Sequence, residues 1–191
     1  MKKYFLAVFL MALTGGMMTS CGDDDTSEYD GYKTVTDDEK ENDSDTTVVV
    51  RDTLAVNIVW DGTTVQLTGD VDSVSYTQTG GDVVITSNID RFLELTLSGS
   101  TSDGSLLVYS LKKYGIILNG VSITNPDGAA INNQCGKSLF LTLADGTVNT
   151  LTDGENYAER TFDQKGTLFS EGQIYYGGTG SLTIYGNGQN G

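Results

Sequence analysis

Short runs in which every second residue is aliphatic recur along the chain from about residue 48 onward. Gly, Asn and Asp separate these runs, the single proline is Pro126, and no stretch has a convincing helical period. Such alternation places aliphatic side chains on one face of a strand and Thr, Ser or Glu on the other. The pattern therefore predicts an all-β fold, with strands at residues 54–59, 83–86, 93–97, 121–124, 139–143 and 182–185.

Weak internal repetition suggests how these strands are arranged. Val121 and Ile123 precede Leu139 and Leu141 by 18 residues. Residues 138–141 resemble 181–184, and residues 130–133 resemble 168–171. Spacings of about 20 residues, or twice that, suit the successive coils of a solenoid, which favours a β-helix. The alternative is a β-sandwich of the jelly-roll or immunoglobulin-like kind.

The N-terminus has the pattern of a secretory signal peptide at residues 1–20. Lys2 and Lys3 precede ten apolar or aromatic residues and then a stretch of small and polar ones. The apolar run is about half of the ~20 residues that a membrane-spanning helix needs. Cys21 follows directly and resembles the lipidated cysteine of bacterial lipoproteins, so we expect it to carry acyl chains that anchor the protein. The alternative is an ordinary signal peptide followed by a chance cysteine.

An acidic segment follows the cysteine. Residues 23–25 are all Asp, which resembles the signal that sends Bacteroidetes lipoproteins to the outer face of the outer membrane. Residues 22–47 hold 11 of the 26 acidic residues and almost no aliphatic ones, so we expect a disordered tether. The expected organisation is a signal peptide at 1–20, a tether at 21–47, a folded domain at 48–191, and attachment to the cell surface.

Composition excludes several classes of function. The chain has no histidine, which excludes catalysis by serine–histidine or cysteine–histidine pairs and histidine-ligated metals. A net charge of -15 argues against nucleic acid and anionic lipid surfaces as partners, so membrane contact is expected through the lipid anchor only. Cys135 has no cysteine partner if Cys21 is acylated, and we expect it to be a small buried residue.

The order of motifs in the second half resembles a known family. The motifs are residues 115–125 (GIILNGVSITN), 128–131, 141–154, 167–172 and 180–188. They resemble the bacterial carbohydrate-binding domain family first described in cellulolytic clostridia, over about residues 64–191. The resemblance implies a right-handed parallel β-helix similar to pectate lyases, with bound calcium and affinity for acidic plant polysaccharide, polygalacturonate above all. Because family domains continue through further coils, it also implies a fold truncated at Gly191.

Two groups of residues are candidates for the site. Tyr175, Tyr176 and Tyr185 offer aromatic faces that stack on sugar rings, although a row of tyrosines on the solvent face of a sheet needs no ligand. Asp145, Asn149 and Asp153 lie at turns and offer the oxygen ligands that calcium prefers. Ordinary turns, in which Asp and Asn bind their own backbone, are the alternative for this second group.

The expected function is non-catalytic capture of acidic polysaccharide by a lipid-anchored surface protein. One alternative is a calcium-dependent polysaccharide lyase, in which Arg160 or Lys165 acts as the base. Arg160 lies in a glycine-poor stretch at residues 155–164, which we expect to loop out of the strands. The other alternative is a purely structural or adhesive surface protein.

Overall fold

The computed structural model describes residues 52–188, so the signal peptide, Cys21 and the acidic tether lie outside the described residues. The described part is built from strands, with one short 3₁₀ helix, η2 (Val71–Ser73). No helix within residues 52–188 is long and apolar enough to span a bilayer.

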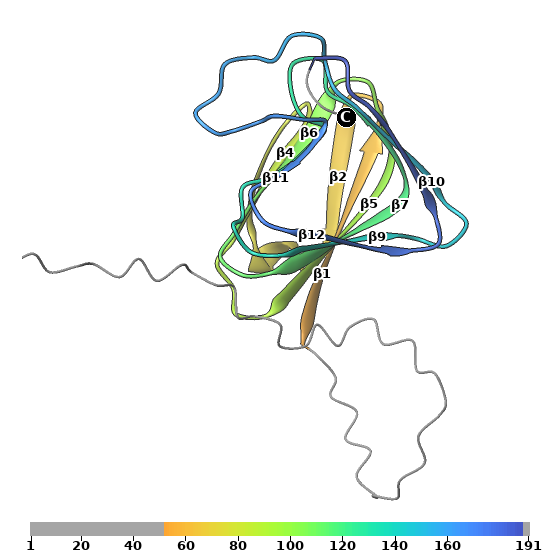
Figure 1. Cartoon of the computed structure of the whole chain (residues 1–191). Helices are drawn as coiled ribbons and strands as arrows, with labels where there is room; N and C mark the ends of the chain where they lie inside the picture. The colour runs from red at the N-terminus through yellow and green to blue at the C-terminus, as the bar shows by residue number, and fades with distance from the viewer. Residues whose placement is uncertain (1–51, 189–191) are drawn as a thin grey trace, which may run out of the picture. The chain divides into compact units, whose positions relative to one another are not determined.

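The strands form two sheets (Figure 1). The eight-stranded sheet contains β1 (Thr53–Asp61), β2 (Thr64–Gly69), β5 (Phe92–Thr101), β7 (Tyr114–Thr124), β9 (Leu139–Leu143), β10 (Val148–Thr152), β12 (Ile174–Gly178) and β13 (Ser181–Tyr185). The five-stranded sheet contains β3 (Ser75–Thr79), β4 (Gly81–Ser87), β6 (Gly104–Ser110), β8 (Ile131–Asn133) and β11 (Leu168–Ser170). All six strands that alternation predicted are present.

The expected right-handed parallel β-helix is wrong, and the sandwich-like sheets match the stated alternative. Both sheets are mixed, because β1 pairs with β2 and β3 pairs with β4 in antiparallel orientation. Each of these hairpins turns through a two-residue loop that starts with a glycine at positive φ, Gly62 at 65° and Gly80 at 60°. Tight hairpins of this kind favour glycine there because other residues rarely adopt that conformation.

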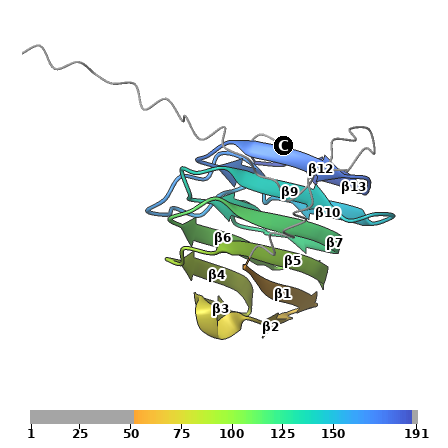
Figure 2. The same ribbon diagram turned by 90° about the horizontal axis from the view of Figure 1, so that it is seen from below.

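Parallel pairing continues from these hairpins to the other edge of each sheet. One ladder runs β1–β5–β7–β9–β12, as Figure 2 shows. The other runs β4–β6–β8–β11. The register aligns side chains in rows across the strands. Leu95, Ile116 and Leu141, for example, are paired neighbours that all point into the core.

One hydrophobic core lies between the sheets. Alternate residues of β1, β4, β5, β6 and β7 are buried, and Trp60 and Tyr114 are the largest of the fully buried side chains. The indole Nε1 of Trp60 on β1 donates to the carbonyl of Gly81 on β4 at 2.7 Å, which links the sheets. Burial of these side chains stabilises the fold by roughly 25 cal/mol for each Å² of apolar surface removed from water.

Two strands of the five-stranded sheet carry an apolar residue on their outward face, where the alternating pattern would place a polar one. Val84 of β4 lies between the buried residues Val83 and Ile85, and Leu107 of β6 lies between Leu106 and Val108. Val84 and Leu107 are paired neighbours and only half-buried. The outward face therefore carries an apolar strip, and part of the chain comes to lie beside it.

Candidate functional site

The segment beside this strip is the long loop between β10 and β11, residues 153–167, which extends from the sheets in Figure 1. Backbone and side-chain bonds fix it to β8, to Gln134 just after β8, and to the turn between β7 and β8. The amide of Ala158 donates to the carbonyl of Asp127 at 2.8 Å. The carbonyl of Asp163 accepts from Asn132 at 3.0 Å and from Gln134 at 2.8 Å. The stretch 155–164 thus runs outside the strands, as the sequence predicted.

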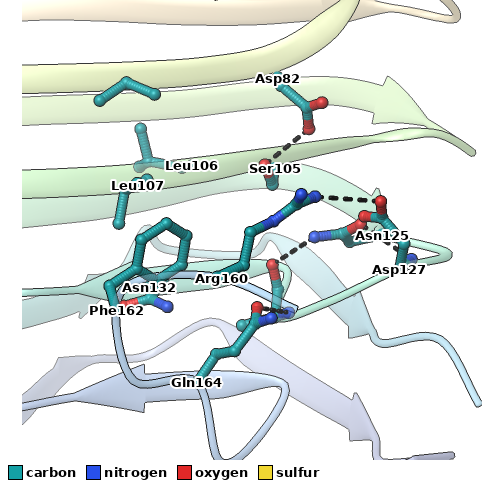
Figure 3. A pocket seen from close by; sticks show the side chains of 12 residues that line it. Asp82, Ser105, Leu106, Leu107, Asn125, Asp127, Asn132, Arg160, Phe162 and Gln164 are labelled. Carbon is teal, nitrogen blue, oxygen red and sulfur yellow. Dashed lines mark hydrogen bonds and ion pairs between the residues drawn. The ribbon is translucent and has the colours of Figure 1, made fainter. Parts of the chain in front are cut away.

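A pocket of about 200 Å³ lies between this loop and the outward face of the sheet (Figure 3). Val84 and Leu107 contribute apolar surface from the sheet, and Phe162 contributes an aromatic ring from the loop. Polar residues complete the lining: Asp82, Ser105, Asn125, Asp127, Asn132, Arg160 and Gln164. Apolar surface with a few placed polar groups is the usual character of a small-molecule site.

Most polar groups of the pocket are held by neighbours. The hydroxyl of Ser105 donates to Oδ1 of Asp82 at 2.6 Å. Asn125 donates to the carbonyl of Ala129 at 2.7 Å and accepts from the amide of Asp127 at 3.2 Å, which shapes the turn. These bonds hold the Asp82 carboxylate and the turn at residues 125–129 in place, so a ligand does not have to order them.

Arg160 supplies the positive charge of the pocket. Its guanidinium lies 3.0 Å from Oδ2 of Asp127, and the two side chains are 41% and 57% exposed. Ion pairs this exposed contribute only about 0–1 kcal/mol, so a ligand carboxylate can exchange with Asp127 at little expense. The pocket can therefore accept hydroxyl donors at its carboxylates and a negative group at Arg160.

The predicted tyrosines lie elsewhere. Tyr175 of β12 stacks on Phe140 of β9, with ring centroids 5.3 Å apart and an angle of 18° between the planes. Tyr176 occupies the same register row as the core residue Leu141, and Tyr185 lies on β13, which does not pair with β12. All three are more than half exposed, but none lines the pocket, and the stack engages one face of Tyr175.

The residues predicted to bind calcium are engaged with the backbone. Oδ1 of Asn149 accepts from the amides of Gly120 and Val121, at 2.9 and 3.0 Å. Asp153 is buried, and its carboxylate accepts from the hydroxyl of Tyr157 at 2.7 Å and from the amide of Asn187. These oxygens do not form a ready set of metal ligands, and residues 52–188 contain no group of three acidic or cysteine side chains placed to hold a metal.

Asp145 differs from these two residues. It is exposed, and its Oδ1 accepts from the hydroxyl of Thr179 on the loop before β13. A neutral hydroxyl partner is easily exchanged, so Asp145 is the carboxylate of the predicted group that a cation can reach. The turn between β9 and β10 is nevertheless satisfied as an ordinary turn by Thr147, whose hydroxyl donates to the carbonyl of Ala144 at 2.7 Å.

Lys165 and Cys135 have chemistry that argues against a reactive role. Lys165 bonds to Asp163 at 2.6 Å, and this hydrogen bond and the charge of Asp163 raise the pKa of the lysine. A raised pKa keeps the amine protonated, which is the opposite of what a general base needs. Cys135 is buried, and burial raises the pKa of its thiol, so it is the small packed residue that the sequence predicted.

Comparison with known proteins places this geometry in a family. Residues 79–191, which include every residue of the pocket, match the family of carbohydrate-binding domain-containing proteins. The chain belongs to this family. The resemblance drawn from residues 115–188 is thereby confirmed at the level of the carbohydrate-binding domain.

Two relatives give the extent of the match. A carbohydrate-binding domain-containing protein of Acetivibrio thermocellus is 38% identical over 101 residues, which cover 50% of this chain and 35% of that protein. The gadolinium derivative of a polysaccharide lyase-like protein from C. thermocellum has a similar structure, with a TM-score of 0.60 and 33% identity. That match covers 70% of this chain and 53% of the solved one, so the chain spans about half of the solved relative and a third of the curated one.

Sequence reasoning named Arg160 but missed the other residues of the pocket. A signal for two of them was present: residues 83–85 and 106–108 are runs of three apolar residues, in which the middle residue must point outward. An apolar side chain that points outward indicates that the surface around it is covered by another part of the chain or binds a ligand. Nothing comparable marked Phe162, because the sequence does not show which surface a loop covers.

Proposed function

We propose that this protein is a lipid-anchored cell-surface protein that binds polysaccharide without cleaving it, and that the pocket between the 153–167 loop and the five-stranded sheet receives the sugar. The observation that carries the proposal is the pocket itself, which lies within the family-matched region. It combines apolar surface from Val84 and Leu107, the ring of Phe162, and hydrogen-bonding groups fixed by their neighbours.

A sugar ring suits this combination of groups. Its C–H surface packs on Val84, Leu107 or the face of Phe162, and its hydroxyls donate to the carboxylates of Asp82 and Asp127. Burial of both kinds of surface at once requires an amphipathic ligand. An apolar ligand would remove the Asp82 carboxylate and the Arg160–Asp127 pair from water without offering them new hydrogen bonds, whereas a small ion would leave the apolar surface uncovered.

The proposed ligand class is acidic plant polysaccharide such as polygalacturonate. Arg160 supports this choice, because its guanidinium can bind a uronate carboxylate in place of Asp127. The net charge of -15 opposes an acidic chain at long range, so we expect affinity to rise with salt until the local Arg160 contact is itself screened. Neutral glycans are the control for this choice of ligand. They carry no carboxylate, so neither the repulsion nor the Arg160 contact should affect their binding.

A polysaccharide lyase is the second candidate, favoured by the polysaccharide lyase-like protein among the similar structures. The side chains beside the pocket argue against it. Arginine remains protonated in proteins, and the pKa of Lys165 is raised by Asp163. Neither side chain is therefore available as an unprotonated base near neutral pH, and we propose that binding is not followed by cleavage.

The lipid anchor and the location at the outer membrane rest on the sequence around Cys21. They fit the proposal physically, because a surface protein that captures an extracellular polymer gains from being held at the membrane by an acidic tether.

Isothermal titration of polygalacturonate fragments and neutral glycan fragments against the wild type tests the proposal. Replacing Phe162 by Ala should weaken binding at least tenfold, about 1.4 kcal/mol. Tyr175→Ala is the matched control, since it removes an exposed aromatic residue outside the pocket. Loss of binding in Tyr175→Ala but not in Phe162→Ala would locate the site on β12 instead. Release of unsaturated uronate product, followed by absorbance, would favour the lyase.

A further inference from the structure

A second hollow lies on the same face of the five-stranded sheet. This shallower hollow, of about 80 Å³, lies over β3 and β4 and is lined by Ser75, Tyr76, Thr77, Val84 and Thr86. Val84 lines both hollows. The two are therefore adjoining parts of one surface, with Val84 between them.

The strand register shows which way this surface runs. Thr77 of β3 pairs with Val84 of β4, Val84 pairs with Leu107 of β6, and Leu107 pairs with Asn132 of β8. Paired residues of neighbouring strands point to the same side of a sheet. Thr77, Val84, Leu107 and Asn132 thus form one row across four strands, which we call the cross-strand row.

The length of the cross-strand row exceeds one sugar. Neighbouring strands lie about 4.8 Å apart, so three such steps span about 14 Å. A single pyranose ring covers only part of that distance. Filling both hollows requires a ligand of two or more linked sugars lying across the strands.

The row is closed at one end and open at the other. Asn132 is buried beneath the 153–167 loop, where it donates to the carbonyl of Asp163. At the other end every residue of β3 is exposed. A chain that occupies the pocket beside the loop can therefore extend along the row only toward β3.

The two hollows differ in charge. The larger pocket is lined by Asp82, Asp127 and Arg160, whereas the lining of the smaller hollow holds three hydroxyl side chains, one tyrosine and no charged residue. Hydroxyl groups and a tyrosine ring, here 45% exposed, suit the hydroxyls and C–H surface of a sugar.

Resting on the proposed function that the ligand is a glycan, we infer that the site binds a glycan chain of at least two sugars. One sugar occupies the pocket beside Phe162, and the next lies over Val84 in the hollow bounded by Thr77. Affinity then depends on chain length through contacts made outside the pocket.

Binding of galacturonate, digalacturonate and trigalacturonate to the full chain, measured by NMR or calorimetry, tests this inference. We expect the wild type to bind the trimer at least fivefold more tightly than the monomer. Thr77→Phe, which fills the smaller hollow, should remove that gain and leave the monomer affinity unchanged. Gln78→Phe is the matched control, since it adds the same ring on the same exposed strand outside both linings.

The outcomes separate the two proposals. Equal affinity for monomer and trimer in the wild type, or a gain with length that persists in Thr77→Phe, would overturn the extended site. Monomer binding that depends on Phe162 would still support the pocket in either case. Binding that is indifferent to Phe162→Ala would overturn the pocket and with it the extended site. Failure of every saccharide to bind would overturn both.

Discussion

The hydroxyl of Tyr114 donates a hydrogen bond to Oδ1 of Asn133 at 2.9 Å, and both side chains are fully buried. Tyr114 belongs to β7 of the eight-stranded sheet and Asn133 to β8 of the five-stranded sheet. The bond therefore crosses the core and joins the two sheets. Asn133 also accepts from the amide of Cys135 and donates to the hydroxyl of Ser170, so it organises the polar end of the core.

Replacing Tyr114 by Phe should lower the free energy of unfolding by about 1–3 kcal/mol, because it deprives a buried amide oxygen of one donor while keeping the ring. Urea denaturation measures the change. Tyr109→Phe is the control, since Tyr109 is an exposed residue of β6. Removing its hydroxyl should change the free energy of unfolding by less than about 0.5 kcal/mol. Equal effects in the two variants would show that the Tyr114 bond contributes nothing specific.

Asn149 gives a second test of stability. Its amide oxygen satisfies two backbone donors, Gly120 and Val121, and its amide nitrogen donates to Thr147 and Ser181. Asn149→Ala leaves the buried amide of Val121 without its acceptor and returns the exposed Gly120 to water, so we expect a loss of about 1–3 kcal/mol. The loss should be the same in chelator and in calcium, and dependence on calcium would instead favour a ligand role for Asn149.

Sequence alternation located strands well but could not set their register. Val121 and Ile123, whose spacing from Leu139 and Leu141 suggested successive coils, are not their neighbours, because Leu139 pairs with Tyr114. β7 pairs with β9 through its first half and with β10 through its second half. Alternating aliphatic residues look alike in every register, so a match between two such runs carries little information about which strands are neighbours.

The sequence could not decide between a solenoid and a sandwich for the same reason, since it does not show which strands are neighbours. The antiparallel pairs β1–β2 and β3–β4 depend on turns at Gly62 and Gly80, which a search for repeats does not consider. The pocket depends on tertiary contacts, since the 153–167 loop is placed by hydrogen bonds that Asn132 and Gln134 donate to the carbonyl of Asp163. The sequence showed that residues 155–164 loop out and that Val84 and Leu107 point outward, but not that the loop lies against these two residues.

The contribution of Glu94 to the free energy of unfolding should fall as the pH rises. Glu94 is a partly buried residue of β5, and burial raises its pKa above the ordinary value of 4.5. The folded state therefore holds this proton more tightly than the unfolded chain does. The stabilising contribution is complete below pH 4.5 and is lost as the pH rises through the raised folded pKa.

Glu94→Gln removes this penalty, so the variant should be more stable than the wild type at pH 7 and should lose that advantage below about pH 4. Thermal melting across this range measures the difference. Glu171→Gln, at an exposed position, is the control and should change little. An advantage for Glu94→Gln that is independent of pH would contradict the explanation by burial.

Calcium at residues 145–153 stays a prediction from the sequence. The structure makes Asp145 the informative position, because its carboxylate is exposed, whereas Asn149 and Asp153 would have to release backbone donors. If calcium binds the native state there, millimolar calcium should raise the melting midpoint of the wild type and not that of Asp145→Asn. An unchanged wild-type midpoint, relative to chelator, would mean that these residues form ordinary turns.

Lipid at Cys21 is the remaining prediction, and it lies outside the described residues. Metabolic labelling with an alkyne analogue of palmitate in a Gram-negative host should label the wild type and not Cys21→Ser. Cys135→Ser is the matched control: Cys135 is 1% exposed and its raised pKa keeps the thiol unreactive, so the label should persist. Several acyl chains, at about 0.8 kcal/mol for each buried CH₂, should also keep the wild type in the membrane fraction after a high-salt wash that releases Cys21→Ser. Absence of label in the wild type, or equal label in Cys21→Ser, would show that Cys21 is not the anchor.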